Sequence, residues 1–178
     1  LVWDNDYKHP VVLAKELATL DLLSDGRLEI GIGAGWMATD YEQAGMQYDR
    51  PGVRIDRFLE GLEIIKRAMT GEKFSFSGKH YTIKDSPALP KPVQSPPPII
   101  VGGGGPKRTP MLAARYAAEF NIPFSGIERF SEQCERVRTA CTSIGRDPQT
   151  LMYSSALVAC IGKNDADIAR RAAALGRE

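Results

Sequence analysis

The feature that most constrains this chain is a run of four glycines that directly follows a short apolar segment. The order along the chain is an apolar segment at 96–101, then Gly102, Gly103, Gly104 and Gly105, then Pro106, Lys107, Arg108 and Thr109. Glycine has no Cβ atom, so the backbone N–H groups of such a loop can approach a ligand closely. The pattern predicts a buried strand, a loop with accessible amides and a helix that begins near Thr109.

A phosphate or a similar anion fits this loop. The N-terminus of a helix carries a partial positive charge, and Lys107 and Arg108 add two cationic side chains beside it. A flexible turn that binds nothing is the alternative. We favour the anion site, because four consecutive glycines lose more backbone entropy on folding than a plain turn requires.

The composition is that of a soluble globular chain whose partner is a small molecule. The chain has 178 residues, 43% of them hydrophobic and 25% charged, which is enough for a core of its own. Its net charge of +1 favours neither nucleic acid nor a membrane surface as a partner. The three cysteines form no Cys-x-x-Cys pair, and two histidines are too few for a typical zinc site. We therefore expect no bound metal, and a cytoplasmic location, where thiols stay reduced.

Both ends of the chain predict an interior piece of a longer protein. The first residues, Leu1-Val2-Trp3, include no methionine or signal pattern and are typical of the close of a strand. The last residues continue the helical spacing of Ala172 and Leu175 up to Glu178.

The spacing of apolar residues predicts helices that alternate with strands. Helical spacing covers the segments 10–25, 58–69, 109–116, 130–141 and 165–175. Strand-like runs lie at 28–32, 99–101, 120–124 and 151–161. In the first helix Leu13, Leu17 and Leu20 share the expected core face. The helix 130–141 buries Cys134 and Cys141, and Asn164 or Asp165 caps the last helix.

The connecting segments differ in kind. The segment 40–52 is polar, and we expect a loop there. Apolar residues alternate on both sides of Ser77-Gly78, which predicts a β-hairpin. The segment 87–98 holds six of the twelve prolines and is expected to cross the surface as an extended strap. We treat 1–178 as a single domain in which 72–98 is an insertion.

This alternation of helices and strands is typical of an α/β fold with a parallel sheet and crossover helices. A closed barrel and a doubly wound sheet both fit it. In either fold, ligands bind at the carboxyl ends of the strands. The glycine-rich ends of segments 28–35 and 99–105 both lie at that edge.

Three motifs in this order and spacing resemble the bacterial luciferase-like monooxygenase superfamily, and within it the branch that uses the deazaflavin coenzyme F420. They are residues 21–36 (DLLSDGRLEIGIGAGW), 89–94 (LPKPVQ) and 99–105 (IIVGGGG). The resemblance extends over nearly all of the chain. It implies an incomplete (β/α)8 TIM barrel that runs from the end of the third strand to the seventh helix, since a whole barrel needs about 250 residues.

The resemblance also implies where a cofactor binds. Residues 2–5, at the end of the third strand, would back the flavin ring, residues 33–36 would flank it, and the four-glycine loop would hold the phosphate of the cofactor tail. The implied cofactor-binding residues are Trp3, Asp4, Asn5, Gly33, Ala34, Gly35, Trp36, Val101, Gly102, Gly103, Gly104, Gly105, Lys107 and Arg108.

The implied reaction is hydride transfer between F420 and a small organic substrate, and a relative that uses FMN would be a monooxygenase instead. The candidate acid–base residues are Asp4, Asp6, His9, Asp40 and Glu42. Helix capping accounts equally well for Asp6 and His9, and a solvated loop for Asp40 and Glu42. Two departures stand out: Trp36 replaces a glutamate of the members that oxidise sugar phosphates, and the loop 124–126 lacks a lysine that some members place near the phosphate.

Two other functions stay open. The run 28–35 also resembles the first motif of Rossmann-like methyltransferases, which bind S-adenosylmethionine. That fold needs a second strand that ends in an acidic residue about 20 residues later, and residues 47–52 offer none. The other possibility is an inactive fragment or a flavin-binding protein without turnover, because an incomplete barrel leaves unpaired strand edges. The resemblance implies a homodimer.

Overall fold

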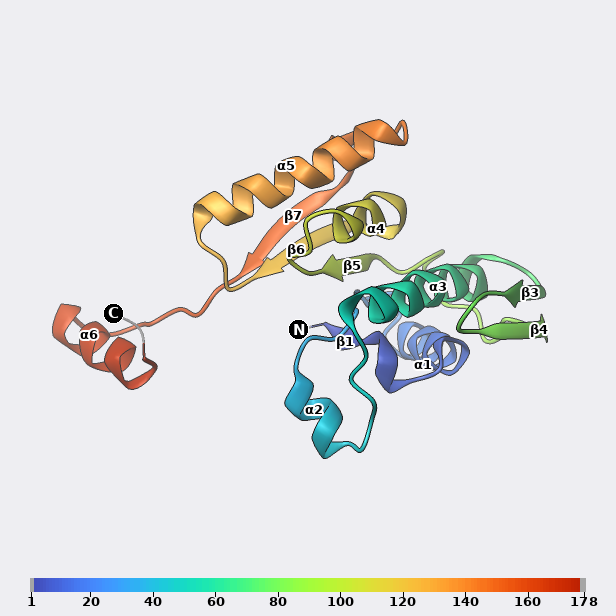
Figure 1. Cartoon of the computed structure of the whole chain (residues 1–178), viewed down its shortest axis with the longest axis horizontal. Coiled ribbons are helices and arrows are strands. Elements are labelled where there is room, and N and C mark those ends of the chain that lie inside the picture. The colour runs from blue at the N-terminus through green and yellow to red at the C-terminus, as the bar shows by residue number, and fades with distance from the viewer. Residues whose placement is uncertain (1, 177–178) are drawn as a thin grey trace.

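A parallel sheet forms the centre of the protein. The computed structural model describes residues 2–176 (Figure 1). The sheet contains five strands: β1 (Trp3–Asp4), β2 (Ile30–Gly33), β5 (Ile99–Gly102), β6 (Glu119–Pro123) and β7 (Met152–Ala156). They lie side by side in chain order, and every neighbouring pair is parallel. A doubly wound sheet reverses its strand order at a switch point. This order does not reverse, so the prediction of an incomplete barrel is confirmed and the doubly wound alternative is wrong.

Four helices pack against one face of this sheet. They are α1 (Pro10–Leu23), α3 (Pro51–Thr70), α4 (Arg108–Tyr116) and α5 (Ile127–Ser143). Alternate strand residues such as Ile32, Val101 and Phe120 are fully buried and join Phe58 of α3 and Val137 of α5 in one hydrophobic core. Right-handed crossovers place successive helices on the same side of such a sheet, as in a barrel wall.

A β-hairpin and a proline-rich strap lie outside the sheet. Strands β3 (Phe74–Ser77) and β4 (Thr82–Ser86) pair antiparallel, which confirms the predicted hairpin. The segment 87–98 has neither helix nor strand. Its Gln94 donates from the backbone and the side chain to the buried Asp21, at 2.8 Å in each case. Although burial opposes it, these hydrogen bonds lower the pKa of Asp21 and tie the strap to the end of α1.

Three predicted elements differ from the structure. The polar segment 40–52 is not all loop, since α2 (Ala38–Gln43) and the first turn of α3 occupy part of it. Pro51 stands in the first turn of α3, where its missing N–H is no loss. Leu20 is 51% exposed and does not share the core face of α1 with Leu13. The predicted strand 151–161 ends at Ala156, because only the residues up to there have β6 as a partner.

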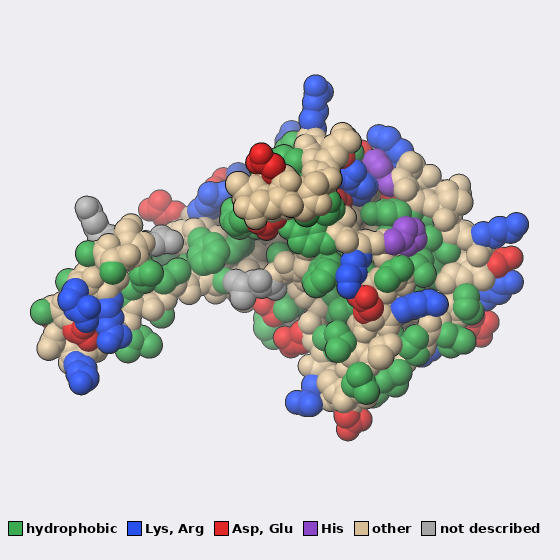
Figure 2. All heavy atoms as spheres, turned by 90° about the horizontal axis from the view of Figure 1, so that it is seen from below, with side chains coloured by type: hydrophobic (Ala, Val, Ile, Leu, Met, Phe, Trp, Pro, Cys, Tyr) green, Lys and Arg blue, Asp and Glu red, His purple; other side chains and the backbone are tan. Residues whose placement is uncertain are grey.

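The chain beyond β7 leaves the body of the protein. Residues 157–164 have neither helix nor strand, and α6 (Asp165–Ala174) follows at the tip of a projecting arm (Figures 1 and 2). The side chain of Asn164 accepts a hydrogen bond from the Asp167 amide at 2.9 Å, which confirms one of the two predicted caps. Cys134 and Cys141 are buried in α5, as predicted. Among residues 2–176, no helix combines the length and apolar character that a membrane span requires.

Candidate functional site

Three segments meet at the carboxyl edge of the sheet. Asp4 at the end of β1 lies opposite Gly33 of β2, and Ile32 lies opposite Val101 of β5. The segments 3–5, 33–36 and 102–105 therefore leave the sheet beside one another. This is the edge where parallel α/β folds bind ligands. The structure thus brings together the three stretches that the sequence singled out.

Val2 lies over the positions where these two strands end, which favours small residues there. A Cβ atom on Gly102 would lie 3.1 Å from Cγ1 of Val2, and one on Gly33 would lie 3.4 Å from its Cγ2. Larger side chains at either position would displace the chain before β1. The two glycines let Val2 pack against the end of the inner sheet face.

The loop after β5 is a shallow cradle of backbone. Gly103 has φ +140°, a conformation that favours glycine, and its N–H donates to the carbonyl of Asn121 at 3.3 Å. The carbonyl of Gly105 accepts from Nε2 of the buried Gln133 at 2.6 Å. Among the residues that the structure describes, the amides of Gly104 and Gly105 have no hydrogen-bond acceptor. Two of the amides that the sequence predicts for an anion are therefore available.

The cations around this loop differ from those expected. Arg108 donates to Asp56 at 2.5 Å and to the carbonyl of Gly52 at 3.1 Å, so it connects α4 to the start of α3. Lys107 is exposed. A third cation lies closer, since a Cβ atom on Gly104 would be 2.9 Å from Nη2 of Arg129. Arg129 stands in the first turn of α5, a segment that the sequence analysis placed outside the helix.

The loop after β2 is held by a buried arginine that the sequence analysis missed. Arg54 of α3 is 5% exposed and donates to the carbonyls of Ala34 and Gly35. Its guanidinium also donates to the carbonyl of Asp49 and the hydroxyl of Tyr48, each at 3.0 Å. The side chain of Arg54 thereby holds the backbone of residues 34–36 from the side of α3.

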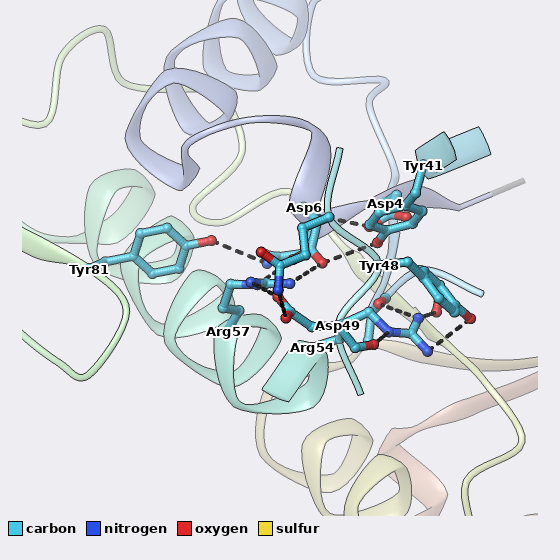
Figure 3. A network of polar contacts seen from close by, with 12 residues as sticks. Asp4, Asp6, Tyr41, Tyr48, Asp49, Arg54, Arg57 and Tyr81 are labelled. Atoms are coloured by element: carbon cyan, nitrogen blue, oxygen red, sulfur yellow. Dashed lines mark hydrogen bonds and ion pairs between the residues drawn. The ribbon is translucent and has the colours of Figure 1, made fainter. Parts of the chain in front are cut away.

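A second polar network supports the end of β1 (Figure 3). Arg57 of α3 makes two bonds to Asp6, at 2.9 and 2.7 Å, and one to Asp49 at 2.7 Å. The hydroxyl of the buried Tyr41 donates to Asp6 at 3.1 Å. The bonds to Asp6 and Asp49 raise the pKa of Arg57, although burial opposes them. Asp6 is therefore bound into a structural network rather than free for proton transfer.

The remaining acid–base candidates lie apart from one another. His9 is exposed and caps α1 through Nδ1, which accepts from the Val11 amide at 3.4 Å. Asp40 and Glu42 are exposed on α2, and Asp40 accepts from the hydroxyl of Tyr7 at 3.2 Å. Asp4 is the candidate on the sheet edge itself. Burial raises the pKa of Asp4, while the hydrogen bond from the Asp6 amide at 2.9 Å opposes that rise.

The predicted wall of the site is solvent-accessible. Trp36 is 71% exposed, so its ring is available to a ligand. Trp3 is 41% exposed, but Nζ of Lys8 lies 5.1 Å from the centre of its ring and Tyr7 packs edge-on against it. Trp3 lies opposite Ile32, whose side chain belongs to the core on the helix side, so the prediction that Trp3 contacts the cofactor does not fit its position.

Gly35, next to Trp36, has φ +75°, and a Cβ atom there would lie 2.3 Å from Oδ2 of Asp4. The two loops therefore interlock, so a substitution at position 35 would disturb both.

One signal in the sequence could have located the missed arginines. Arg54 and Arg57 are three residues apart, so they lie on the same face of the helix that follows the loop 34–50. A polar face at the start of a crossover helix points toward the carboxyl edge of the sheet. The sequence analysis counted only the apolar face of that helix.

Comparison with known proteins identifies relatives of the whole chain. The family model described as luciferase-like monooxygenase matches residues 5–177. The F420-dependent hydroxymycolic acid dehydrogenase of Mycobacterium tuberculosis is 32% identical over 95% of this chain, and the FMNH2-dependent dimethylsulfone monooxygenase of Pseudomonas putida is 28% identical over 76%. The chain spans 45% and 38% of the lengths of these two relatives.

A solved structure shows the same fold. The coenzyme F420-dependent tetrahydromethanopterin reductase of Methanopyrus kandleri superposes with a TM-score of 0.83 at 21% identity. The match covers 93% of this chain and 50% of that protein. At this identity the likeness supports the fold alone.

Proposed function

We propose that this chain, which belongs to the luciferase-like monooxygenase family, forms the cofactor-binding part of an oxidoreductase that transfers a hydride between coenzyme F420 and a small organic substrate. The observation that carries the proposal is the meeting of segments 3–5, 33–36 and 102–105 at one edge of the sheet. The segment 33–36 offers the exposed ring of Trp36, and the segment 102–105 offers open amides beside a cation. A flat ring with an anionic tail matches that combination.

The residues present fit such a group. The glycines at 33 and 102 add no side chains to the inner face beneath Val2, and the amides of Gly104 and Gly105 beside Arg129 suit a phosphate. Trp36 would contact the ring, while the short segment 4–5 would back it. When bound, the deazaflavin supplies the hydride acceptor or donor. The chain itself provides position and fixed dipoles.

Among the acid–base candidates, Asp4 is the side chain at this site that is placed to carry a proton for the reaction. Its raised pKa leaves part of the carboxyl protonated at a higher pH than an exposed aspartate. We assign to Asp4 a role in holding or moving a proton at Oδ2, the oxygen that packs against Gly35. His9 and the two acids of α2 are exposed farther along the rim, and they stay candidates from the sequence.

FMN is the alternative cofactor, and the dimethylsulfone monooxygenase among the relatives is the observation that favours it. Both cofactors carry a flat ring system and a phosphate on the tail, so the open amides suit either. A small-molecule substrate, a homodimeric assembly and a cytoplasmic location stay predictions of the sequence analysis.

The proposal is tested by titrating the full-length protein that contains this chain with F420 and separately with FMN, and following the absorbance of each. We expect saturable binding of F420, weaker binding of FMN, and a loss of affinity for Gly104→Val, because its side chain would take the place of the Arg129 guanidinium beside the amides. Gly126→Val is the matched control, since nothing lies within 4 Å of a Cβ atom there. Equal affinity of the two variants would contradict the anion cradle. Preferred binding of FMN would select the monooxygenase alternative, and no binding of either would overturn the function.

A further inference from the structure

An unusual buried amide follows the first strand. Asn5 is 1% exposed, and its Nδ2 donates to the hydroxyl of Tyr81 at 3.4 Å. Its Oδ1 is buried and has no hydrogen-bond partner among the described residues. Buried polar atoms without a partner are rare in folded proteins, because their lost hydration is not replaced. The carboxamide is therefore kept in this place at a cost to stability.

A glycine in the interior of α3 makes room for this amide. A Cβ atom on Gly61 would lie 2.1 Å from Oδ1 of Asn5 and 3.1 Å from its Cγ, and both distances are too short for an unstrained contact. Glycine inside a helix is itself unfavourable relative to alanine. Two locally unfavourable residues, distant in sequence, thus meet in one contact, which is the pattern expected where geometry matters more than stability.

Tyr81, the third residue of this contact, is also held by α3. Glu60, next to Gly61, accepts hydrogen bonds from the amides of Lys79, His80 and Tyr81, at 2.8, 2.9 and 3.0 Å. The tip of the hairpin is therefore anchored to the same helix turn that admits Asn5. Tyr81 lies at the Nδ2 end of the carboxamide, and Figure 3 shows its hydroxyl pointing toward Asp6 and Arg57.

We propose that Gly61 and Tyr81 form a socket that positions Asn5, and that this socket sets the backbone path of residues 3–5 at the edge where the cofactor ring would bind. Gly61 and Tyr81 are positioning residues, since they act through Asn5. The hairpin insertion thereby gains a role, because its tip supplies one wall of the socket. The effect on the cofactor rests on the proposed function, whereas the effect on residues 3–5 does not.

A fluorescence experiment tests the socket without any cofactor. The chain contains two tryptophans, so Trp36→Phe leaves Trp3 as the reporter beside Asn5. In this background we expect Gly61→Ala to shift the emission of Trp3 and to raise its quenching by acrylamide about twofold or more, because a clash of this size moves the backbone. Gly52→Ala, in the same helix and with nothing within 4 Å of its Cβ position, should leave Trp3 unchanged. Both substitutions remove the same backbone entropy of a helical glycine.

A rescue experiment separates the socket from general destabilisation. In the double variant Asn5→Ala with Gly61→Ala the added methyl group has space, so the step from glycine to alanine should no longer move the Trp3 signal. Tyr81→Phe, which removes one hydroxyl without a clash, should shift the signal in the same direction by less. A merely structural role would lower the unfolding midpoint of Gly61→Ala and leave Trp3 as in Gly52→Ala, and that outcome would overturn the proposal.

The cofactor arm uses the same variants in the full-length protein. F420 affinity should fall about tenfold or more in Gly61→Ala, in line with the cost of displacing a packed segment, and stay unchanged in Gly52→Ala. If the parent protein binds neither F420 nor FMN, the proposed function fails, while the Trp3 measurements still decide whether the socket exists. If Trp3 moves and affinity does not, residues 3–5 do not contact the cofactor, and the link from the socket to cofactor binding is overturned.

Discussion

Replacing Arg54 with methionine is expected to destabilise the protein far more than the same change at Arg67 of the same helix. Arg54 is 5% exposed and donates to three backbone carbonyls and to the hydroxyl of Tyr48. Arg67 is 46% exposed at its side chain and pairs with Glu63 one turn away. The two variants therefore differ in burial and in partners, while the chemical change is identical.

The size of the expected loss in stability follows from the carbonyl and hydroxyl groups that lose their hydrogen-bond donor. Methionine keeps the apolar stem, so the loss is polar. A hydrogen bond to a charged group contributes about 1.5 to 3 kcal/mol, and the half-buried carbonyls of residues 34, 35 and 49 regain only part of that from water. The guanidinium also lies 4.2 Å from the ring centre of Tyr48, a contact worth about 1 kcal/mol. We expect a loss of about 3 kcal/mol for Arg54→Met, and less than about 1 kcal/mol for Arg67→Met.

The assay is equilibrium unfolding in urea followed by circular dichroism, with both variants measured beside the parent protein. Arg54→Lys should recover little of the loss, because an ammonium group cannot serve four acceptors in the planar geometry of a guanidinium. Losses of free energy that agree within experimental error for the two methionine variants would refute the reasoning. They would show that the loop after β2 does not depend on this clamp.

Three further predictions concern charges and thiols. Asp6→Asn should lower the free energy of unfolding by about 2 to 3 kcal/mol in urea, because Arg57 loses its two-bond partner and keeps one acid, and an effect below about 0.5 kcal/mol would refute this. The pKa of Asp21 is lowered, so its carboxylate stabilises the fold at every pH above its ordinary pKa of 3.8. This stability is lost as the pH falls through the pKa of the folded state. The stability gap to Asp21→Asn should therefore close in acid, and a gap that widens there would contradict the assignment. A disulfide reagent at mild alkaline pH should modify Cys160 first, since burial raises the pKa of both thiols in α5, and fast modification of three thiols in the native protein would be inconsistent with this structure.

The fold could be read from the sequence wherever a periodic pattern was long. The helix around Phe58 and Leu62 and the hairpin around Gly78 both had enough alternation to be recognised. The short helix α2 was missed because its six residues show one buried side chain, Tyr41. The strand after Leu151 was drawn too long, since apolar residues continue where no neighbouring strand remains to pair with them. Whether a strand has a neighbour to pair with depends on the whole fold and not on the sequence of the strand itself.

The sequence predicted the backbone segments of the site but missed the side chains that surround them. The glycine loop could be found from the sequence, because four consecutive glycines have few explanations other than a close approach to the backbone. The contact of Arg129 with Gly104 and the clamp of Arg54 join segments more than 18 residues apart, and no local pattern reports such contacts. Arg108 shows the converse, since a cation adjacent to the loop in sequence turns to Asp56 instead.

The most direct test of the central claim is a crystal structure of the full-length protein grown with F420. The account predicts that the phosphate of the tail lies within hydrogen-bond distance of the Gly104 and Gly105 amides, beside Arg129, with the ring between residues 3–5 and 33–36. A tail bound elsewhere on the sheet edge, or a side chain filling the glycine cradle while F420 binds at another surface, would contradict it.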